Sequence, residues 1–274
     1  MARRDTQDSG RDDPVAQYLQ AIEQGDAHRL RTVWPGQVVV NDPLVGEVRG
    51  HKELRHFVSR NQSWLSEHHA RTETVAATYA GQRAVVELLG SVEQDGQTVS
   101  WPIAVVAESP DDRSVVFRTY CSTWPVEGHR HLRPPILDAR AHAPDDVVGR
   151  YQKAQEGGDI DGILETFQPQ GYFREPIGSQ AWHRGTDELR VFFLEYFRSG
   201  IPKFELCEIT DDGERCAVEY NCVRWGPRDI PPQAGIAIFE RGGDGLLAAV
   251  RVYDDVEPPA VPSDSHPTTP RTIS

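Results

Sequence analysis

The chain has 274 residues and a net charge of −13 at pH 7. This length predicts about two domains, and the negative charge argues against nucleic acid and anionic membranes as partners, because both bind proteins through clustered cations. No apolar run approaches the roughly 20 residues that span a bilayer, and residues 1–8 lack the apolar core of a signal peptide. We therefore expect a soluble, cytoplasmic protein without membrane contact.

Composition divides the chain into five segments. Residues 1–12 are charged and polar and residues 258–274 are rich in Pro, Ser and Thr, which predicts a disordered tail at each end. A Pro-rich segment, 126–143, separates two regions of similar length and is expected to be a surface linker. The predicted domains are therefore residues 13–125 and 144–257.

The predicted elements follow one order in both regions: helix, helix, strand, helix and then several strands. In the second region, helical spacing over 147–154 ends at two glycines, and a second helix with Ile163, Leu164 and Phe167 on one side follows Asp159. A short strand is expected at 171–176 and a helix at 188–197. Alternating patterns then predict strands at 204–209, 216–225, 234–239 and 246–253. Helices followed by an antiparallel meander indicate an α+β fold.

The two regions also repeat one another, with an offset of about 133 positions. The matches keep their order along the chain, so we interpret them as two copies of one fold. The paired segments are Tyr18 to Asp26 with Tyr151 to Asp159, Asp42-Pro43 with Glu175-Pro176, Arg49 to Phe57 with Arg184 to Phe192, Glu87 with Glu219, Ile103-Ala104 with Ile236-Ala237, and Arg118 to Tyr120 with Arg251 to Tyr253.

This succession of motifs (Tyr and Gly-Asp on the helices, an acid before Pro, then Arg-Gly-x-x-Glu-Leu-Arg-x-Phe) resembles the SnoaL-like, ketosteroid-isomerase-like branch of the nuclear-transport-factor-like superfamily. The resemblance covers both copies. It implies two cone-shaped α+β barrel domains, each a curved antiparallel sheet covered by three helices around an apolar pocket. The fold hosts isomerases, aldol cyclases, epoxide hydrolases, dehydratases and binding modules, so it does not by itself select a reaction.

The resemblance implies roles for residues in both copies. The acid before Pro is the general base of the isomerase pattern, and the first-helix tyrosine donates a hydrogen bond to the developing oxyanion. These positions are Glu175 and Tyr151 in the second copy and Asp42 and Tyr18 in the first. The pattern's pocket aromatics correspond to Phe167 and Phe193 in the second copy and to Trp34 in the first.

One part of the isomerase pattern is missing. Its protonated aspartic acid would fall near Gly235 or Pro102, and neither side chain can donate a hydrogen bond. Because such a donor is worth several kcal/mol in a transition state, steroid isomerisation itself is disfavoured.

The surroundings of Glu175 leave two alternatives open. Its neighbours Phe173, Pro176 and Ile177 are apolar, so an inward-pointing carboxylate would be desolvated, which suits a group that exchanges protons. The alternative is an exposed acid at a strand end, paired with Arg174 or Arg184.

A second pair of acids recurs at the start of a later strand. Glu73 and Glu205 each follow a basic residue two positions earlier, Arg71 and Lys203. Two acids in one pocket suit epoxide opening, in which one protonates the oxirane oxygen and the other releases the nucleophile. The alternative is a salt bridge at the strand edge.

Alternation along the strands selects further pocket residues. In 216–225 the more apolar face carries Tyr220 and Arg224, which we expect to reach toward a ligand, whereas Glu219 lies on the outer face with its counterpart Glu87. Asp254 continues the alternation of the last strand and is a candidate second acid facing Glu175. Its counterpart in the first copy is a cysteine, so such a site belongs to the second copy.

No metal or cofactor is predicted. The chain lacks phosphate-binding, nucleophile-elbow and zinc-protease motifs, and His129, His131 and His142 in the linker lack metal-ligand spacing. Cys207 and Cys216 flank the turn at 211–213 and could face each other across a hairpin, although free thiols are expected in a reducing cytoplasm.

These observations predict a cofactor-independent acid/base enzyme of secondary metabolism. Its substrate would be a small apolar, polyketide-like or terpenoid-like molecule, and it would act as an isomerase, cyclase or epoxide hydrolase. The alternative is a non-catalytic small-molecule-binding or assembly protein in which side chains fill one or both pockets. In either case we expect the two copies to pack against each other as a pseudo-dimer.

Overall fold

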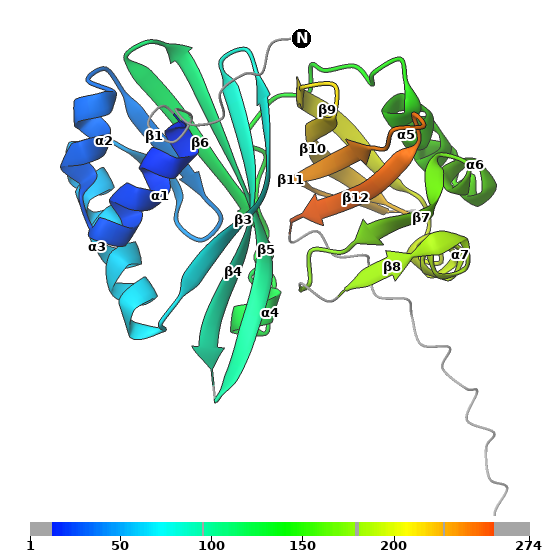
Figure 1. Cartoon of the computed structure of the whole chain (residues 1–274), viewed down its shortest axis with the longest axis horizontal. Helices are drawn as coiled ribbons and strands as arrows, with labels where there is room; N and C mark the ends of the chain where they lie inside the picture. Colours follow the sequence, from blue (N-terminus) through cyan, green and yellow to red (C-terminus); the bar gives the residue numbers. More distant parts are fainter. Residues whose placement is uncertain (1–12, 95, 179–180, 227, 255–274) are drawn as a thin grey trace, which may run out of the picture.

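The computed structural model describes residues 13–94, 96–178, 181–226 and 228–254. The predicted disordered tails, 1–12 and 258–274, lie outside the described residues. Two domains stand side by side, each with its helices on the outer side and its sheet turned toward the other domain (Figure 1). Within the described residues, no helix combines the length and apolar character needed to cross a membrane.

The first domain begins with two capped helices. The side chain of Asp13 accepts hydrogen bonds at the start of the first helix, Asp26 does so at the second, and Gly25 takes the left-handed conformation between them. The elements are α1 (Pro14–Gln24), α2 (Ala27–Val33), β1 (Val38–Asp42), β2 (Gly46–Arg49), α3 (His51–Glu67), β3 (Arg71–Ala80), β4 (Arg83–Gln94), β5 (Gln97–Asp111) and β6 (Ser114–Cys121).

The second domain repeats this order after a short helix, α4 (Trp124–Glu127), at the junction of the first domain and the linker. Its elements are α5 (Val147–Gly157), α6 (Ile160–Leu164), β7 (Phe167–Arg174), β8 (Trp182–Arg184), α7 (Gly185–Tyr196), β9 (Pro202–Asp211), β10 (Arg215–Trp225), β11 (Arg228–Arg241) and β12 (Leu247–Tyr253). Two details differ from the sequence-based prediction. The second helix ends at Leu164, so Phe167 begins a strand instead of closing a helix, and β8 was not predicted.

Each domain has one six-stranded sheet, in the orders β2-β1-β6-β5-β4-β3 and β8-β7-β12-β11-β10-β9. The pairs β1–β6 and β7–β12 are parallel, and the others are antiparallel. Three helices cover one face of each sheet, and an apolar core fills the space between them. The predicted α+β class with two cone-like domains is confirmed.

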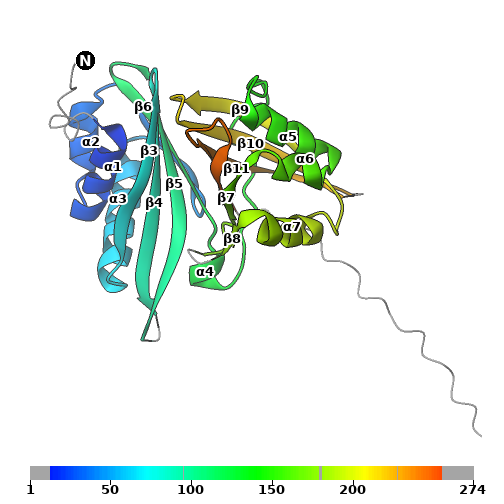
Figure 2. The same ribbon diagram turned by 45° about the vertical axis from the view of Figure 1, so that its right-hand side comes forward.

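The other faces of the two sheets contact each other. Ala104 and Val106 from β5 share a buried apolar cluster with Ile236 and Ile238 from β11, and a second view shows the two sheets adjacent (Figure 2). Strand register places Ala104 beside Tyr120 and Ile236 beside Tyr253. Ala104 therefore corresponds to Ile236, one residue away from the predicted match with Ala237. A shift of one residue exchanges the two faces of a strand, so this correction assigns Ile236 to the interface.

Two buried ion pairs cross this interface in a reciprocal arrangement. Arg118 of the first domain binds Glu219 through two nitrogens, with Nη2 2.8 Å from Oε2, and the hydroxyl of Tyr120 donates to the same carboxylate. In the same way Arg251 and Tyr253 of the second domain bind Glu87, with Arg251 Nη2 2.8 Å from Oε1. Glu87 and Glu219 therefore lie on the outer faces of their sheets, where the alternation predicted them, buried between the domains.

The linker is partly buried. The guanidinium of Arg133 lies 4.7 Å from the ring centre of Tyr120 and donates to the carbonyl oxygens of Thr119 and Asn41. The carbonyl oxygen of Arg133 accepts a hydrogen bond from the Ala234 amide, at 2.9 Å. One linker residue thus contacts the first domain through its side chain and the second through its backbone, which ties the two domains together.

The four cysteines are free thiols. Cys216 pairs with Asp211 across the β9–β10 hairpin. The suggestion that it faces Cys207 is therefore wrong, because the register places another residue opposite it.

Candidate active site

A cavity opens inside the cone of the second domain. Its volume is about 960 Å³, including the part open to solvent, and it is bounded by α5, α7, β7 and β9 to β12. Most of its wall is made of aromatic and aliphatic side chains, which suits an apolar ligand with few hydrogen-bonding groups. The aromatic residues of the wall are Tyr151, Phe173, Phe192, Tyr196, Phe204, Tyr220, Trp225 and Phe239.

Glu175 lies at this cavity directly after β7, two residues beyond Phe173, and both side chains line it. Its Oε1 atom is 2.8 Å from Nε2 of His183, whose ring stacks on Phe192 with ring centres 4.2 Å apart. Both side chains are partly solvated, with 31% of Glu175 and 27% of His183 exposed. Glu175 is therefore a carboxylate at the rim of the cavity, held by an imidazole.

A second acid of the cavity is buried. Asp254 follows β12, and the hydroxyl of Tyr220, on β10, donates a hydrogen bond to its Oδ2 atom. Burial, followed by the charge of Asp254, raises the pKa of Tyr220 well above its ordinary value. Tyr220 therefore keeps its proton and remains a donor to Asp254.

The two acids lie on neighbouring strands. In the parallel pair β7–β12, Phe173 is opposite Val250 and Arg174 is opposite Arg251. Glu175 is thus one residue beyond this last pair and Asp254 three residues beyond it, on the same face of the sheet. Adjacent strands are about 4.8 Å apart, so this register brings two carboxyl groups into one cavity.

Glycine at position 235 makes room for the buried acid. A Cβ atom there would lie 2.6 Å from Oδ2 of Asp254 and 2.7 Å from the Tyr220 ring. This is the position near which the isomerase pattern has its protonated aspartic acid. In this chain a carboxyl group occupies the neighbouring space, but it comes from the adjacent strand.

We expect Gly235→Ala to lower thermal stability by about 1–3 kcal/mol, because the added methyl group overpacks the site. Gly243→Ala is the matched control, since its Cβ would meet nothing within 4 Å. Thermal denaturation of both variants measures the difference. Equal melting temperatures would show that Tyr220 and Asp254 are not held against position 235.

Two further tyrosines line the cavity. Burial raises the pKa of Tyr151 and of Tyr196 far above the ordinary value, so both hydroxyls stay protonated. The amide of Gln155 donates to the Tyr196 hydroxyl at 3.3 Å. Phe167 and Phe193 contact Tyr151 edge-on, with ring centres 6.0 and 6.4 Å away. They pack behind Tyr151 and are absent from the residues that line the cavity.

Two predicted pocket residues of the second domain point elsewhere. Glu205 lies on the face of β9 opposite to Phe204 and Leu206, which line the cavity, and its carboxylate is 3.9 Å from Lys203. Of the two roles considered for Glu205, a pocket acid or a salt bridge at the strand edge, this geometry matches the salt bridge. Arg224 is exposed because a bulge between Cys222 and Arg224 interrupts the alternation of β10. The bulge turns Trp225 into the cavity instead.

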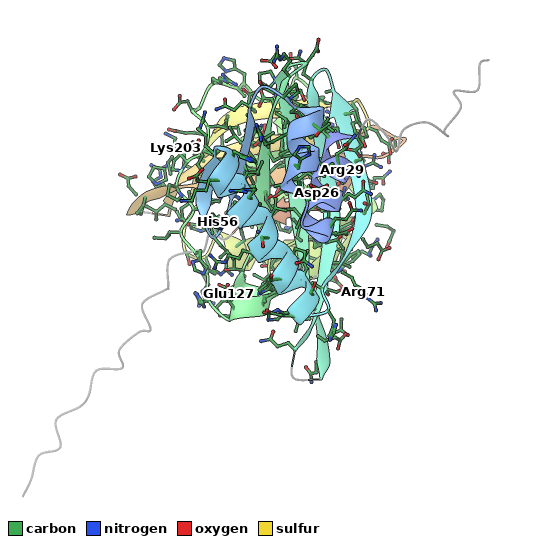
Figure 3. All side chains as sticks on the ribbon, turned by 90° about the vertical axis from the view of Figure 1, so that its left-hand side faces the viewer. Asp26, Arg29, His56, Arg71, Glu127 and Lys203 are labelled. Atoms are coloured by element: carbon green, nitrogen blue, oxygen red, sulfur yellow. The ribbon has the colours of Figure 1, made fainter. Side chains whose placement is uncertain are left out.

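In the first domain the corresponding residues take part in packing and turns. Tyr18 stacks on Phe117 at 4.5 Å between ring centres, and Trp34 meets the same ring edge-on at 5.6 Å. Oδ1 of Asp42 accepts hydrogen bonds from the two backbone amides of its turn, at 2.9 and 3.1 Å. Glu73 is exposed near the start of β3, where Arg71 lies at the surface (Figure 3). Phe117 precedes Arg118 on β6 as Val250 precedes Arg251 on β12, so Phe117 is the residue of the first domain that corresponds to Val250.

Sequence reasoning missed His183 and Arg130. His183 is on the three-residue strand β8, which is too short to show periodicity. Arg130 lines the cavity but comes from the linker, where no sequence pattern assigned it to the second domain.

A model of the SnoaL-like domain family matches residues 15–130 and 148–250, which together make up most of the chain. The chain therefore belongs to the SnoaL-like family and contains two copies of its domain. A search of curated proteins found no significant match.

Solved structures with a similar fold each align with about two fifths of this chain. A candidate polyketide cyclase from Sinorhizobium meliloti is 24% identical, covers 40% of this chain and 94% of its own length, with a TM-score of 0.34. A protein from Catenulispora acidiphila with a ketosteroid-isomerase-like fold, solved with trimethylamine, is 15% identical over 43% of this chain and 91% of its own, with a TM-score of 0.35. Because these TM-scores are below 0.5, the family assignment rests on the domain model.

Proposed function

We propose that the chain is a cofactor-independent acid/base enzyme that acts on a small apolar molecule in the second domain. One observation carries the proposal: a single aromatic cavity contains two carboxyl groups in different surroundings, Glu175 at its rim and Asp254 buried. Unequal surroundings are what separates the protonation states of an acid and a base.

In the proposed reaction Glu175 removes a proton from a substrate carbon beside a carbonyl group. His183 holds its Oε1 atom and fixes the orientation of the carboxylate. The buried Asp254 gives a proton to the substrate oxygen, while the Tyr220 hydroxyl holds the Asp254 side chain. Tyr151 is a further donor at the cavity. Return of the proton from Glu175 to another carbon of the substrate, with the enol proton going back to Asp254, completes an isomerisation. In a cyclisation the enol attacks a second carbonyl, whose oxygen takes the proton from Glu175 while the enol proton goes back to Asp254.

The same pair could open an epoxide, with Asp254 protonating the ring oxygen and Glu175 accepting the proton of the nucleophile. The aromatic wall favours a polyketide-like or terpenoid-like ring system for either reaction.

We propose a structural role for the first domain. Its Tyr18, Trp34 and Asp42 are engaged in packing and in a turn, and its outer face pairs with the second domain through reciprocal ion pairs. We propose that residues 13–125 and 144–257 act as an intramolecular pseudo-dimer, in which the first domain supports the sheet that carries the cavity.

Binding of fused-ring aromatic ketones tests the cavity. Val250 lines it, whereas the first domain has Phe117 at this position, stacked on Tyr18. We expect Val250→Phe to weaken binding at least ~10-fold, because the new ring occupies ligand space. Val191→Phe, on the exposed face of α7, adds the same ring outside the cavity and should leave binding unchanged.

Quenching of Trp225 fluorescence reports occupancy, since Trp225 lines the cavity. Trp225→Phe should remove this signal. Equal affinity of the Val250→Phe and Val191→Phe variants would place the ligand elsewhere.

A further inference from the structure

Three side chains of the linker converge after α4. Gly128 adopts the left-handed conformation (φ 71°) and ends the helix, so the chain turns back over Glu127. His129 and His131 are alternate residues of the segment that follows. One nitrogen or oxygen atom from each of Glu127, His129 and His131 lies within 4.8 Å of the other two. Spacing along the sequence did not predict this group, because the turn at Gly128 creates it.

The hydrogen bonds orient both imidazoles toward one carboxylate oxygen. Nδ1 of His129 is 3.0 Å from the carbonyl oxygen of Glu127. A carbonyl oxygen only accepts, so Nδ1 carries the hydrogen and the lone pair of the neutral ring is on Nε2. This Nε2 atom lies 3.6 Å from Oε2 of Glu127, and Nε2 of His131 lies 2.7 Å from the same oxygen.

These separations suit a shared metal ion. Zinc–nitrogen and zinc–oxygen bonds of about 2.0–2.2 Å place neighbouring ligand atoms of a tetrahedral site about 3.3 Å apart, between the two distances observed. His129 donates its Nδ1 hydrogen to the backbone carbonyl oxygen of Glu127. Metal-bound histidines are commonly oriented by such a hydrogen bond from their other ring nitrogen. With 62% of its side chain exposed, His129 can adjust its rotamer. Glu127 lies at the edge of the molecule (Figure 3), so solvent can fill the remaining positions.

We propose that Glu127, His129 and His131 bind one divalent first-row transition metal ion, such as Zn²⁺, Co²⁺ or Ni²⁺. Two imidazoles and a carboxylate are borderline ligands that suit these ions better than Mg²⁺ or Ca²⁺, which prefer oxygen atoms alone. The net charge of −13 favours accumulation of cations near the protein.

The ion would also fix part of the cavity wall. Arg130 lies between the two histidines, and its guanidinium lies 5.7 Å from the ring centre of Trp124 and lines the cavity of the second domain. Coordination of His129 and His131 holds the backbone on both sides of Arg130. The metal site therefore positions a cation at the cavity, and it requires no catalytic role for the metal.

Titration of the full chain, without a histidine tag, with Co²⁺ tests the proposal. We expect one equivalent to bind with the visible absorption of Co²⁺ bound to nitrogen and oxygen ligands. His129→Ala together with His131→Ala should weaken binding at least ~10-fold. His142→Ala is the matched control, because His142 is an exposed linker histidine outside the group. The double variant and the control both change exposed or half-buried side chains, and thermal denaturation checks that they fold.

Glu127→Gln provides an independent test, since it keeps the shape of the side chain and removes the charge. It should weaken Co²⁺ binding while His142→Ala does not. Unchanged affinity of the double histidine variant would overturn the proposal. So would an intense sulfur-to-cobalt absorption band in the wild type, because it would place the ion on a cysteine.

Discussion

We expect Glu175→Gln to lower turnover by about 10²–10⁴-fold, the usual contribution of a positioned general base, which is the role proposed for Glu175. The amide keeps the shape of the side chain and can still contact His183, but it cannot accept a proton from the substrate. Binding of the apolar substrate should change little, because most of the residues that line the cavity are apolar or aromatic. We therefore expect kcat to fall with KM nearly unchanged, measured on substrates found among the ring ketones and epoxides that bind.

Asp42→Asn is the matched control in the first domain. Asn keeps the Oδ1 atom that accepts the two turn amides, because an amide oxygen forms the same turn. Turnover should therefore stay at the wild-type level. If Glu175→Gln is as active as wild type, Glu175 is not the base. If wild type and both variants bind ligand but none of them converts any substrate, the result supports the alternative function, a non-catalytic small-molecule-binding protein.

Removal of one interface carboxylate has the largest expected effect on stability. Glu87→Gln removes the buried negative charge that pairs with the Arg251 guanidinium and leaves Glu240, which is partly exposed, as the carboxylate still paired with it among the described residues. Breaking a buried ion pair in this way costs about 3–5 kcal/mol. Urea denaturation at pH 7 measures the loss. The exposed Glu73→Gln is the control and should change stability by less than ~0.5 kcal/mol.

The effect of pH on this ion pair has a definite sign. Burial alone would raise the pKa of Glu87, but the hydrogen bonds and charge of Arg251 outweigh it, and the pKa is lowered. A carboxylate with a lowered pKa in the folded state stabilises the fold above its unfolded pKa, about 4.3, and this contribution is lost as pH falls through the folded value.

Wild-type stability should therefore decrease below about pH 4.3, and Glu87→Gln should show less of this decrease. Equal stability of Glu87→Gln and wild type at pH 7, together with an unchanged pH dependence, would contradict the assigned ion pair.

The fold was predictable because its signals are local and occur twice. Asp26 and Asp159 cap a helix, and Gly25 and Gly158 end the helix before it in the left-handed conformation. Helix caps of this kind can be recognised from neighbouring residues in the sequence, without knowledge of contacts between distant segments. The register of β5 against β11 was not predictable to one residue. Ala104 and Ile236 correspond only through their partners on β6 and β12, which are long-range pairings.

For the site, the sequence was informative where strands are regular. Alternation relates Asp254 to Val250 and Val252, and all three line the cavity. It failed at the bulge of β10, where Trp225 rather than Arg224 turns inward, because a bulge leaves no reliable mark in one sequence. It also could not find His183, which reaches Glu175 only through the pairing of β7 with β8.

A crystal structure of the Glu175→Gln variant with a trapped substrate tests the central claim most directly. We expect the ligand inside the second domain, with a substrate oxygen within hydrogen-bond distance of Asp254 and the reacting carbon or nucleophile beside position 175. A ligand bound in the first domain, between Tyr18 and Asp42, or one in the second domain that contacts neither carboxyl position, would contradict the proposed site.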